Sequence, residues 1–297
     1  MLENLPRVSV LLSTYNPENF LEKQIQSIKD QISVNIELFV RDDASASYEY
    51  LDKINEYIIP TNLEKGKQNL GPAKSFMRLL EFEKGNDFVA FADQDDIWHP
   101  EKIRSAVDAI GFTDIPTLYY SNVYLFEEHD ANNVKKSDFN FVQLPRSFFE
   151  NSAMGCTIVM NAAAVSTIKK YSNRNAVMHD WFCALIIHLN GNIIFDPVPK
   201  MLYRIHPNQS VGYRKNRSIR SLRNLDYLRT TMSQTEEIVE QSKYSKNYEM
   251  VPNLYRNTKH YKNKLFKIRI ICSRQKLRTS FFADLSVRLR LVAISFF

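Results

Sequence analysis

Three aspartates crowd into four residues of this chain: Asp93, Asp95 and Asp96 directly follow an apolar run at residues 88–92. The run has the length and the β-branched or aromatic content of a buried strand, so the acids should lie just past its carboxyl end. Carboxylates this close repel one another unless a cation lies among them. An Asp-x-Asp pair suits a hard divalent cation that phosphate oxygens also hold. The cluster therefore predicts a metal–phosphate site, at the sheet edge where open α/β sheets bind ligands.

Asp96 has a simpler interpretation than its two neighbours. A helix is expected to begin at residues 100–102, and an aspartate shortly before it is suited to be its N-cap. We adopt this interpretation for Asp96. It does not account for Asp93 and Asp95.

Strand–loop–helix units precede the acid cluster and should position it. Apolar runs predict strands at residues 7–16 and 36–40, and helical spacing predicts helices at residues 17–29, 48–58 and 73–82. With the run at 88–92, each strand is followed by polar residues. This alternation predicts an α/β domain with a parallel sheet of Rossmann-like character.

The second half of the chain changes rhythm and predicts a mixed extension of the sheet, which supplies the other wall of a cleft. A polar loop is expected at residues 134–145. The other expected elements are strands at 118–125, 155–161 and 198–205 and helices at 162–170 and 179–189.

Charge divides the chain unevenly. The 297 residues are 44% hydrophobic and 24% charged, which is globular composition. The net charge of +6 combines −7 for residues 1–212 with +13 for residues 213–297. We therefore expect a catalytic domain at 1–212 and a basic helical region at 213–297 that meets an anionic surface.

Features that are missing from the sequence indicate the cellular compartment of the protein. No apolar run approaches the ~20 residues of a membrane span, and residues 1–4 do not read as a signal peptide. Three scattered cysteines fit neither a disulfide framework nor a zinc site. These features predict a cytoplasmic protein.

Seven stretches, taken in order, resemble the family 2 glycosyltransferases, which have the GT-A fold. Each is weak alone, but together they span about two thirds of the chain. The forms Asp-Gln-Asp-Asp-Ile-Trp, His-Asp-Trp and Tyr-Arg-x-His are most similar to the bacterial rhamnosyltransferase-type branch. One departure is Ala44, where the family usually has Gly or Asn. The stretches lie at residues 8–16, 42–45, 69–71, 92–98, 155–157, 179–181 and 203–208.

The resemblance implies inverting transfer of a sugar from a nucleoside-diphosphate donor, such as a UDP- or dTDP-sugar. Tyr15 would stack on a pyrimidine and Asp43 would accept its ring N–H. Ser13 and Asn69 match neighbouring nucleotide-binding positions, and Asp93 would support the ribose or the metal. In the alternative interpretation, Tyr15 is a half-buried aromatic residue and Asp43 caps a turn.

The departing diphosphate needs its charge compensated, which a metal bridging its oxygens supplies. The resemblance implies Mn²⁺ or Mg²⁺ with Asp95 and His206 as ligands. A lone histidine also has a structural interpretation, which stays open for His206. Arg204 is a further candidate for a phosphate contact.

Deprotonation of the acceptor hydroxyl needs a base that is ionised at neutral pH. The resemblance implies Asp180, at a helix N-terminus where the macrodipole favours the anion. Its alternative is an N-cap carboxylate without chemistry. His179 matches the family position next to that of the base, so the resemblance favours Asp180 over His179 as the base.

Acceptor binding is assigned to a second group of residues. Gly155, Cys156 and Thr157 would form the floor of a site for a glycan or lipid-linked acceptor, and Trp98 would stack on a sugar face or else belong to the core. Residues 280–297 are apolar, aromatic and basic. They predict a peripheral helix on the inner face of the cell membrane, or a helix packed on the catalytic domain or on a second subunit of a homo-oligomer.

Two rival functions fit the sequence less well than a glycosyltransferase does. A sugar nucleotidyltransferase normally needs a Gly-rich triphosphate loop with Arg and Lys after the first strand, whereas residues 13–17 read Ser-Thr-Tyr-Asn-Pro. A non-catalytic nucleic-acid binder would explain the basic tail but would leave the acid cluster and Asp180 unexplained. No nucleic-acid motif is recognised in the tail, so no nucleic-acid partner is expected.

Overall fold

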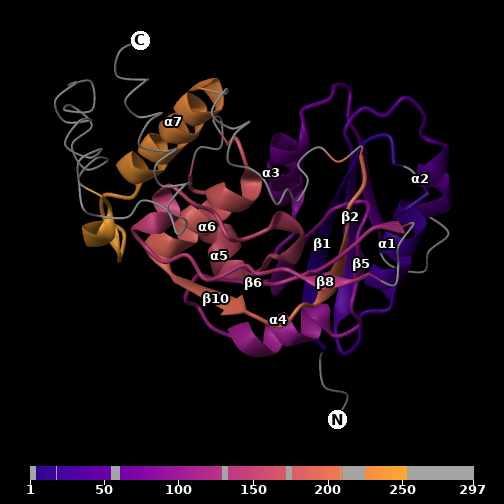
Figure 1. The fold of residues 1–297 in the computed structure, drawn as a ribbon, viewed down its shortest axis with the longest axis horizontal. Helices are drawn as coiled ribbons and strands as arrows, with labels where there is room; N and C mark the ends of the chain where they lie inside the picture. The colour runs from indigo at the N-terminus through magenta and orange to yellow at the C-terminus, as the bar shows by residue number, and fades with distance from the viewer. Residues whose placement is uncertain are drawn as a thin grey trace.

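A seven-stranded sheet forms the centre of the computed structural model (Figure 1), which describes residues 5–252 apart from 18, 55–60, 129–132, 172–175, 208 and 210–224. The strand order is β10-β6-β9-β4-β1-β2-β3. Only β9 runs antiparallel to its neighbours β4 and β6. The α/β fold with a mostly parallel sheet is confirmed. The strands are β1 (Arg7–Thr14), β2 (Asn35–Asp42), β3 (Thr61–Lys65), β4 (Phe88–Ala92), β6 (Thr117–Ser121), β9 (Val159–Asn161) and β10 (Asn192–Asp196).

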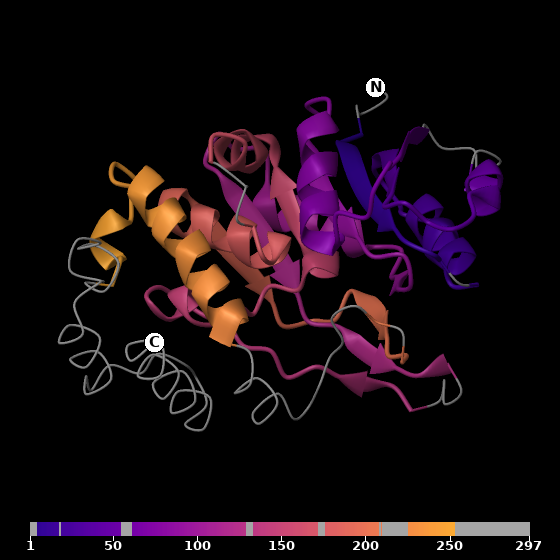
Figure 2. The ribbon, with the colours of Figure 1, turned by 90° about the horizontal axis from the view of Figure 1, so that it is seen from above.

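Helices cover both faces of this sheet (Figures 1 and 2). One face packs against α1 (Leu21–Lys29), α2 (Glu49–Ile54) and α4 (Lys102–Ile110). The other packs against α3 (Pro72–Phe82), α5 (Ala162–Ile168) and α6 (His179–Asn190), with α7 (Leu225–Gln241) beside α6.

The central strands are apolar throughout because both faces of the sheet are covered. Along β4, Val89 and Phe91 pack towards the α3 and α6 side, whereas Phe88, Ala90 and Ala92 pack towards the α1 and α4 side. All five are at most 1% exposed. A parallel sheet covered on both faces needs such continuous apolar runs.

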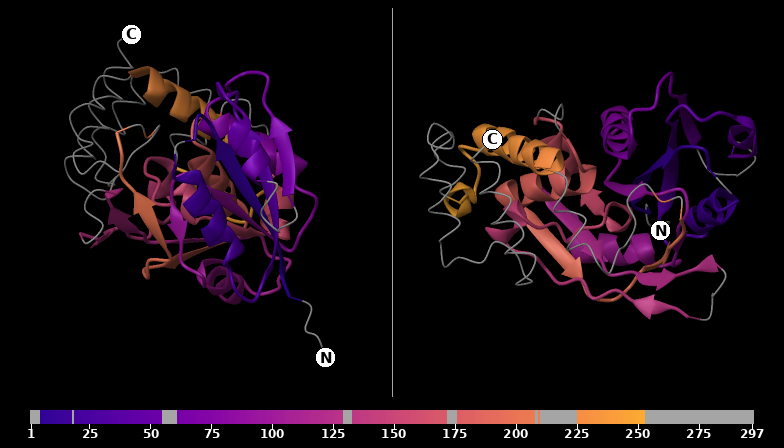
Figure 3. Two further views of the ribbon diagram at one scale, coloured as in Figure 1. Left: turned by 90° about the vertical axis from the view of Figure 1, so that its right-hand side faces the viewer. Right: turned by 45° about the horizontal axis from the view of Figure 1, so that its top comes forward.

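A separate four-stranded sheet, in the order β5-β11-β7-β8, lies beside the central one (Figure 3). Its strands are β5 (Ile97–Trp98), β7 (Tyr124–Phe126), β8 (Lys135–Lys136) and β11 (Met201–Arg204). β11 pairs antiparallel with β5 and parallel with β7. Because β5 directly follows the acid cluster, this pairing brings the end of β11 beside it.

Several predicted elements have different boundaries in the structure. The strand expected at 118–125 is two strands in different sheets, β6 and β7, and residues 155–157 form a 3-10 helix (Gly155–Thr157) before β9. β8 lies within the loop expected at 134–145. β3, β5 and β10 were not predicted, because they are short or too polar to give an apolar alternation. Two further 3-10 helices are Arg146–Phe148 and Tyr248–Met250.

The structure describes only residues 225–252 of the region after residue 213, and these pack on the preceding domain. Ile238 and Val239 of α7 are at most 1% exposed and lie in the same hydrophobic cluster as α6. Residues 225–252 therefore share the core of the preceding domain. Residues 213–224 and the predicted interfacial helix at 280–297 lie outside the described residues. No described helix is both long enough and apolar enough to cross a bilayer.

Candidate functional site

Three neighbouring strands end together and deliver predicted site residues to one edge of the sheet. β1 lies between β4 and β2, with Thr14 paired to Asp42 and Leu12 to Ala92. Tyr15, Asp43 and Asp93 are the next residues after these strands. Because parallel strands place their carboxyl ends at the same edge, the three residues share it.

The two predicted metal ligands lie together although 111 residues separate them. His206 Nε2 is 2.7 Å from Asp95 Oδ2, and both side chains are about 15% exposed. The pairing of β11 with β5 explains this closeness, since Asp95 precedes β5 and His206 follows β11. A carboxylate oxygen and an imidazole nitrogen at this spacing form a donor pair that suits a divalent transition ion.

Arg204 is buried and contacts the backbone of the acid cluster, so its guanidinium is not exposed for the phosphate contact that the sequence suggested. The side chain is fully buried, and its guanidinium lies over the rings of Phe20 and Phe126, 4.3 and 4.7 Å from their centroids. Its Nε donates to the main-chain oxygen of Asp95 at 2.8 Å, and it pairs with Glu128. Arg204 therefore holds the backbone of Asp95, one of the two predicted metal ligands.

The like charges in the cluster affect its protonation. Burial, together with the charges of Asp95 and Asp180, raises the pKa of Asp93 to about 7. Burial likewise raises the pKa of Asp96 well above its ordinary value. Beneath them, burial lowers the pKa of Lys102 to about 7. A cation among these carboxylates would favour their ionised forms.

In this segment the N-cap interpretation of Asp96 is wrong, and of the two interpretations of Trp98 the core position is confirmed. Asp96 is not an N-cap, since Glu101 holds that position of α4, and Asp96 is fully buried and accepts the main-chain N–H of Arg204 at 3.2 Å. Trp98 is only 3% exposed, and Lys102 Nζ lies 3.6 Å from its ring centroid. The Trp98 ring therefore belongs to the core and has no face for an acceptor sugar.

The predicted nucleotide-binding residues are held by hydrogen bonds between neighbouring loops. The Asp43 carboxylate pairs with Arg41 and accepts the N–H groups of Leu70 and Gly71 at 2.8–3.0 Å. Asn69 Oδ1 also accepts the Gly71 N–H at 3.0 Å. Gly71 has φ +78°, a conformation that favours glycine. Asp43 thus ties the end of β2 to the turn before α3.

Ser13 and Ala44 flank this arrangement. Ser13 Oγ is 2.6 Å from Ser75 Oγ of α3, so the hydroxyl is engaged within the protein. Ala44 has φ +67°, in the left-handed region, which costs an L-residue with a Cβ roughly 1–2 kcal/mol. The family preference for Gly or Asn after the paired aspartates thus has a physical reason, and Ala44 retains the turn under strain.

Asp180 lies in the first turn of α6 but is not its N-cap, a position that Met178 holds. Its Oδ1 accepts the Trp181 N–H at 2.6 Å, and it is close enough to Asp93 to raise that residue's pKa. Nine of the twelve residues of α6 are buried, which makes the helix a rigid support. Asp180 is therefore not the N-cap residue itself, although its carboxylate accepts a main-chain N–H in the first turn of the helix.

His179 is a core residue, and the segment from Gly155 to Thr157 packs against it. Its ring stacks on Phe76 with centroids 4.2 Å apart, and burial lowers its pKa to about 3, so it stays neutral. A Cβ at Gly155 would lie 2.5 Å from His179 Nε2, so this position needs glycine. Gly155, Cys156 and Thr157 are buried, and Cys156 Sγ lies within 4.8 Å of ligand atoms of Asp93 and Asp96. Burial raises the pKa of the Cys156 thiol, which therefore stays protonated.

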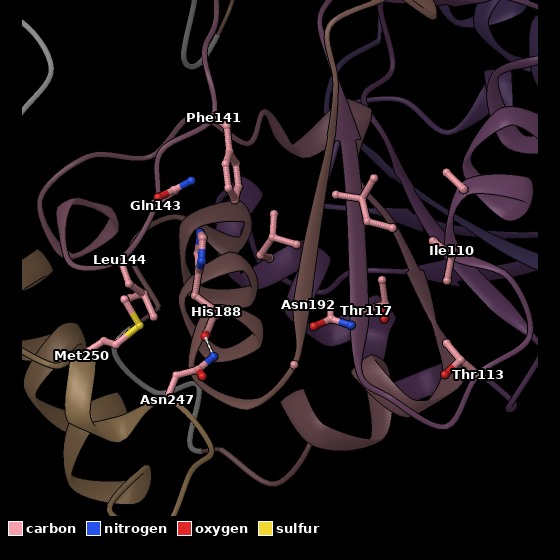
Figure 4. Close-up of a pocket in the computed structure, with 14 residues that line it drawn as sticks. Ile110, Thr113, Thr117, Phe141, Gln143, Leu144, His188, Asn192, Asn247 and Met250 are labelled. Atoms are coloured by element: carbon pink, nitrogen blue, oxygen red, sulfur yellow. Dashed lines mark hydrogen bonds between the residues drawn. The ribbon is translucent and has the colours of Figure 1, made fainter.

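A groove of about 640 Å³ lies elsewhere on the molecule (Figure 4). Its walls include Thr117 and Asn192, the first residues of β6 and β10, together with Phe141, His188 and Asn247. It therefore lies towards the amino ends of these strands and contains none of the predicted site residues. The groove is therefore separate from the acid cluster.

The family model described as glycosyl transferase family 2 matches residues 9–175. The chain belongs to glycosyl transferase family 2. This membership decides against the sugar nucleotidyltransferase and the non-catalytic nucleic-acid binder, and the protein is a glycosyltransferase.

Curated relatives of this glycosyltransferase include dTDP-rhamnosyl transferase RfbG of Shigella flexneri, 33% identical over 220 residues, which cover 68% of this chain and 73% of the relative. The putative teichuronic acid biosynthesis glycosyltransferase TuaG of Bacillus subtilis is 27% identical, and its match covers 52% of this chain and 62% of TuaG.

Solved structures share the fold at low sequence identity. TarS 1–349 of S. aureus in complex with UDP-GlcNAc superposes with a TM-score of 0.58 at 17% identity, covering 98% of this chain and 91% of TarS. The mannosyltransferase PcManGT of Pyrobaculum calidifontis, in complex with GDP-Man and Mn²⁺, has a TM-score of 0.55 at 14% identity and covers 97% and 86% of the two chains. These likenesses confirm the GT-A-type fold.

Gln94 and Arg204 hold the backbone of predicted site residues in ways that the sequence motifs did not indicate. Gln94 is the middle residue of the Asp-x-Asp motif and contacts the backbone of Tyr15. Arg204 anchors Asp95 through the backbone. Both lie inside recognised motifs, but only the three-dimensional arrangement shows which atoms they bind.

Proposed function

We propose that this glycosyltransferase moves a sugar from a nucleoside-diphosphate donor to a glycan or lipid-linked acceptor, with inversion, in cell-surface polysaccharide synthesis. The observation that carries the proposal is the Asp95–His206 pair beyond the ends of β1 and β4, on the same side as Asp180. The relative RfbG, a dTDP-rhamnosyl transferase, makes dTDP-rhamnose the first donor to test.

The donor atoms of the site fit Mn²⁺ or Mg²⁺. Asp95 and His206 would hold the ion, with Asp93 beside it, because their oxygen and nitrogen atoms are close and partly exposed. Burial and the nearby charges of Asp95 and Asp180 raise the pKa of Asp93, and a cation at this place would favour its ionised form. When bound, such an ion compensates the charge of the departing diphosphate.

The chain's own residues would carry out the remaining tasks. Tyr15, which is 47% exposed, presents its ring for stacking on the base. Asp43 would contact the base, and Asn69 and Ser13 would line the same end of the site. Asp180 would accept the proton of the acceptor hydroxyl. The hydroxyl oxygen of the acceptor would then form its bond to the anomeric carbon of the donor sugar as the bond between that carbon and the diphosphate breaks. Gly155, Cys156 and Thr157 would support the acceptor from below.

The test is a donor screen with purified full-length protein. Nucleotide sugars, dTDP-rhamnose and UDP-sugars among them, are incubated with and without lipid-linked acceptors, in Mn²⁺, Mg²⁺ or EDTA. We expect metal-dependent release of a nucleoside diphosphate and a product with the anomeric configuration opposite to the donor's. A product that retains the donor's configuration, or equal turnover in EDTA, would contradict the mechanism.

We also propose that the basic C-terminal residues bring the enzyme to the inner face of an anionic membrane. Residues 253–297 contain eleven Lys and Arg residues and one acidic residue, Asp284. Each basic residue near such a surface contributes up to ~1 kcal/mol, and the attraction weakens as salt shortens the Debye length from ~10 Å at 0.1 M to ~3 Å at 1 M.

Liposome flotation checks this membrane prediction. The full-length protein is compared with a version that ends at Pro252, which keeps α7 and its buried contacts. We expect the full-length protein alone to float with anionic vesicles, less so at 1 M salt, and neither protein to float with neutral vesicles. Equal recovery of both proteins with anionic vesicles would contradict it and favour a tail that packs on its own domain or on a second subunit.

A further inference from the structure

The side chain of Gln94 holds both main-chain polar groups of a residue 79 positions away. Its Oε1 accepts the N–H of Tyr15 at 2.8 Å, and its Nε2 donates to the Tyr15 carbonyl oxygen at 3.2 Å. Gln94 stands between Asp93 and Asp95 and is itself half-buried. The acid motif and the loop after β1 are therefore joined by a two-point contact.

The Tyr15 loop is held separately on its other side. The Asn16 N–H donates to Ser45 Oγ at 2.7 Å, and Asn16 Oδ1 accepts the Ala46 N–H at 2.8 Å. Within the described part of the chain, these bonds join the loop to the segment after β2. Gln94 joins the same loop to the acid motif, on the side of β4.

Tyr15 depends on these backbone contacts for its position. Its side chain is 47% exposed, and the phenol makes no hydrogen bond or ring contact with the part of the chain that the structure describes. The position of the ring therefore depends in part on the position of the Tyr15 backbone. A shift of the acid motif would move the Tyr15 backbone through Gln94, and the reverse also holds.

We infer that Gln94 is a positioning residue that couples the diphosphate and metal end of the donor site to the base end. The inference rests on the proposed function, in which Asp95 and His206 hold the ion and Tyr15 stacks on the base. Binding at one end orders the motif, and the Gln94 contacts pass that order to Tyr15, so the second contact costs less conformational entropy. Coupling of this kind is reciprocal between the two ends.

The coupling is measurable as a ratio of affinities. Calorimetry gives the Kd of dTDP and of UDP with and without Mn²⁺, and the ratio is the enhancement by the metal. Gln94→Met has similar length and loses both hydrogen bonds, and Gln94→Asn keeps a neutral amide but is one methylene too short. We expect both variants to lower the enhancement about tenfold, within the usual range of coupling between sites.

Two control variants separate coupling from general damage. Asn16→Gly removes the Asn16 Oδ1 contact on the other side of Tyr15 and tolerates its φ of 41°. It should weaken nucleotide binding equally with and without Mn²⁺, leaving the ratio unchanged. Gln26→Met removes an exposed glutamine on α1, bonded only to Asp30 among the described residues, and should change neither Kd.

The outcomes distinguish this inference from the proposed function. If Mn²⁺ enhances binding equally in the wild type and in both Gln94 variants, Gln94 does not couple the ends, while the proposed function stands. If Mn²⁺ has no effect on nucleotide binding by the wild type, the proposed metal site and the coupling are both overturned. Thermal melts without ligand show whether each variant is folded, and Gln94→Asn retains an amide should Gln94→Met fail.

Discussion

Asp180→Asn is expected to lower the transfer rate by at least ~100-fold while donor binding stays near that of the wild type. Asparagine has the shape of aspartate but cannot accept the proton of the acceptor hydroxyl. Asp180 would act on the acceptor hydroxyl in the transition state, whereas other residues would bind the nucleotide of the donor. The loss should therefore fall on kcat and not on the donor Kd.

The structure indicates that this substitution leaves the fold intact. Met178 is the N-cap of α6, so the helix does not depend on Asp180 for its cap. The Asp180 Oδ1 that accepts the Trp181 N–H at 2.6 Å has an equivalent in asparagine. Removing one charge also relieves Asp93, whose pKa Asp180 helps to raise. The variant should melt no lower than the wild type.

Initial rates and calorimetry check the prediction on the same preparations. Asp108→Asn is the matched control, because Asp108 is an exposed helical aspartate that pairs with Arg104 away from the site. The control should keep its full transfer rate. An Asp180→Asn protein that retains most of its rate is incompatible with a role as the base.

The sequence predicted the Asp95–His206 arrangement only through recognised motifs. Apolar runs located β1, β2 and β4 because strands buried on both faces carry a strong signal. That Asp93 follows a strand end was therefore predictable from residues alone. The approach of His206 depends on the pairing of β11 with β5, a strand of two residues, and no periodicity indicates a contact that short.

The errors have physical causes of the same kind. Trp98 looks like a site residue because it follows the acid motif, but β5 places the Trp98 ring in the core beside Lys102. Asp96 looks like an N-cap because a helix is expected shortly after it. Asp96 is buried against the backbone of Arg204, a partner 108 residues away. The boundary expected at residue 213 followed a change in charge, whereas burial of Ile238 and Val239 places α7 on the preceding domain. Charge patterns describe surfaces and do not show which helix face is buried.

Asp95→Ala is expected to abolish the Mn²⁺-dependent stabilisation of the protein by a nucleoside diphosphate. Asp95 supplies the carboxylate of the predicted ligand pair, and its loss leaves His206 without that partner at 2.7 Å. Ligand at 100 times its Kd stabilises a protein by about 2.7 kcal/mol, and a ~100-fold weaker affinity leaves only about 0.4 kcal/mol. The difference is large enough to read from a thermal melt.

The fold should survive because the main chain at Asp95 is anchored independently of its side chain. The Asp95 carbonyl oxygen accepts from Arg204 Nε at 2.8 Å, and the Arg204 N–H donates to Asp96. His206→Ala should reproduce the effect from the other side of the pair, since it removes the second ligand. His99→Ala, at an exposed histidine beside α4, should leave the stabilisation unchanged.

Melts of the four proteins with dTDP or UDP, in Mn²⁺ and in EDTA, complete the test. In EDTA the wild type and Asp95→Ala should be stabilised by similar small amounts, because Tyr15 and Asp43 remain in place. In Mn²⁺ only the wild type and His99→Ala should gain further stability. Metal-dependent stabilisation that persists in Asp95→Ala would remove this carboxylate from the site. Its persistence in His206→Ala alone would leave Asp95 as the ligand and make His206 its hydrogen-bond partner.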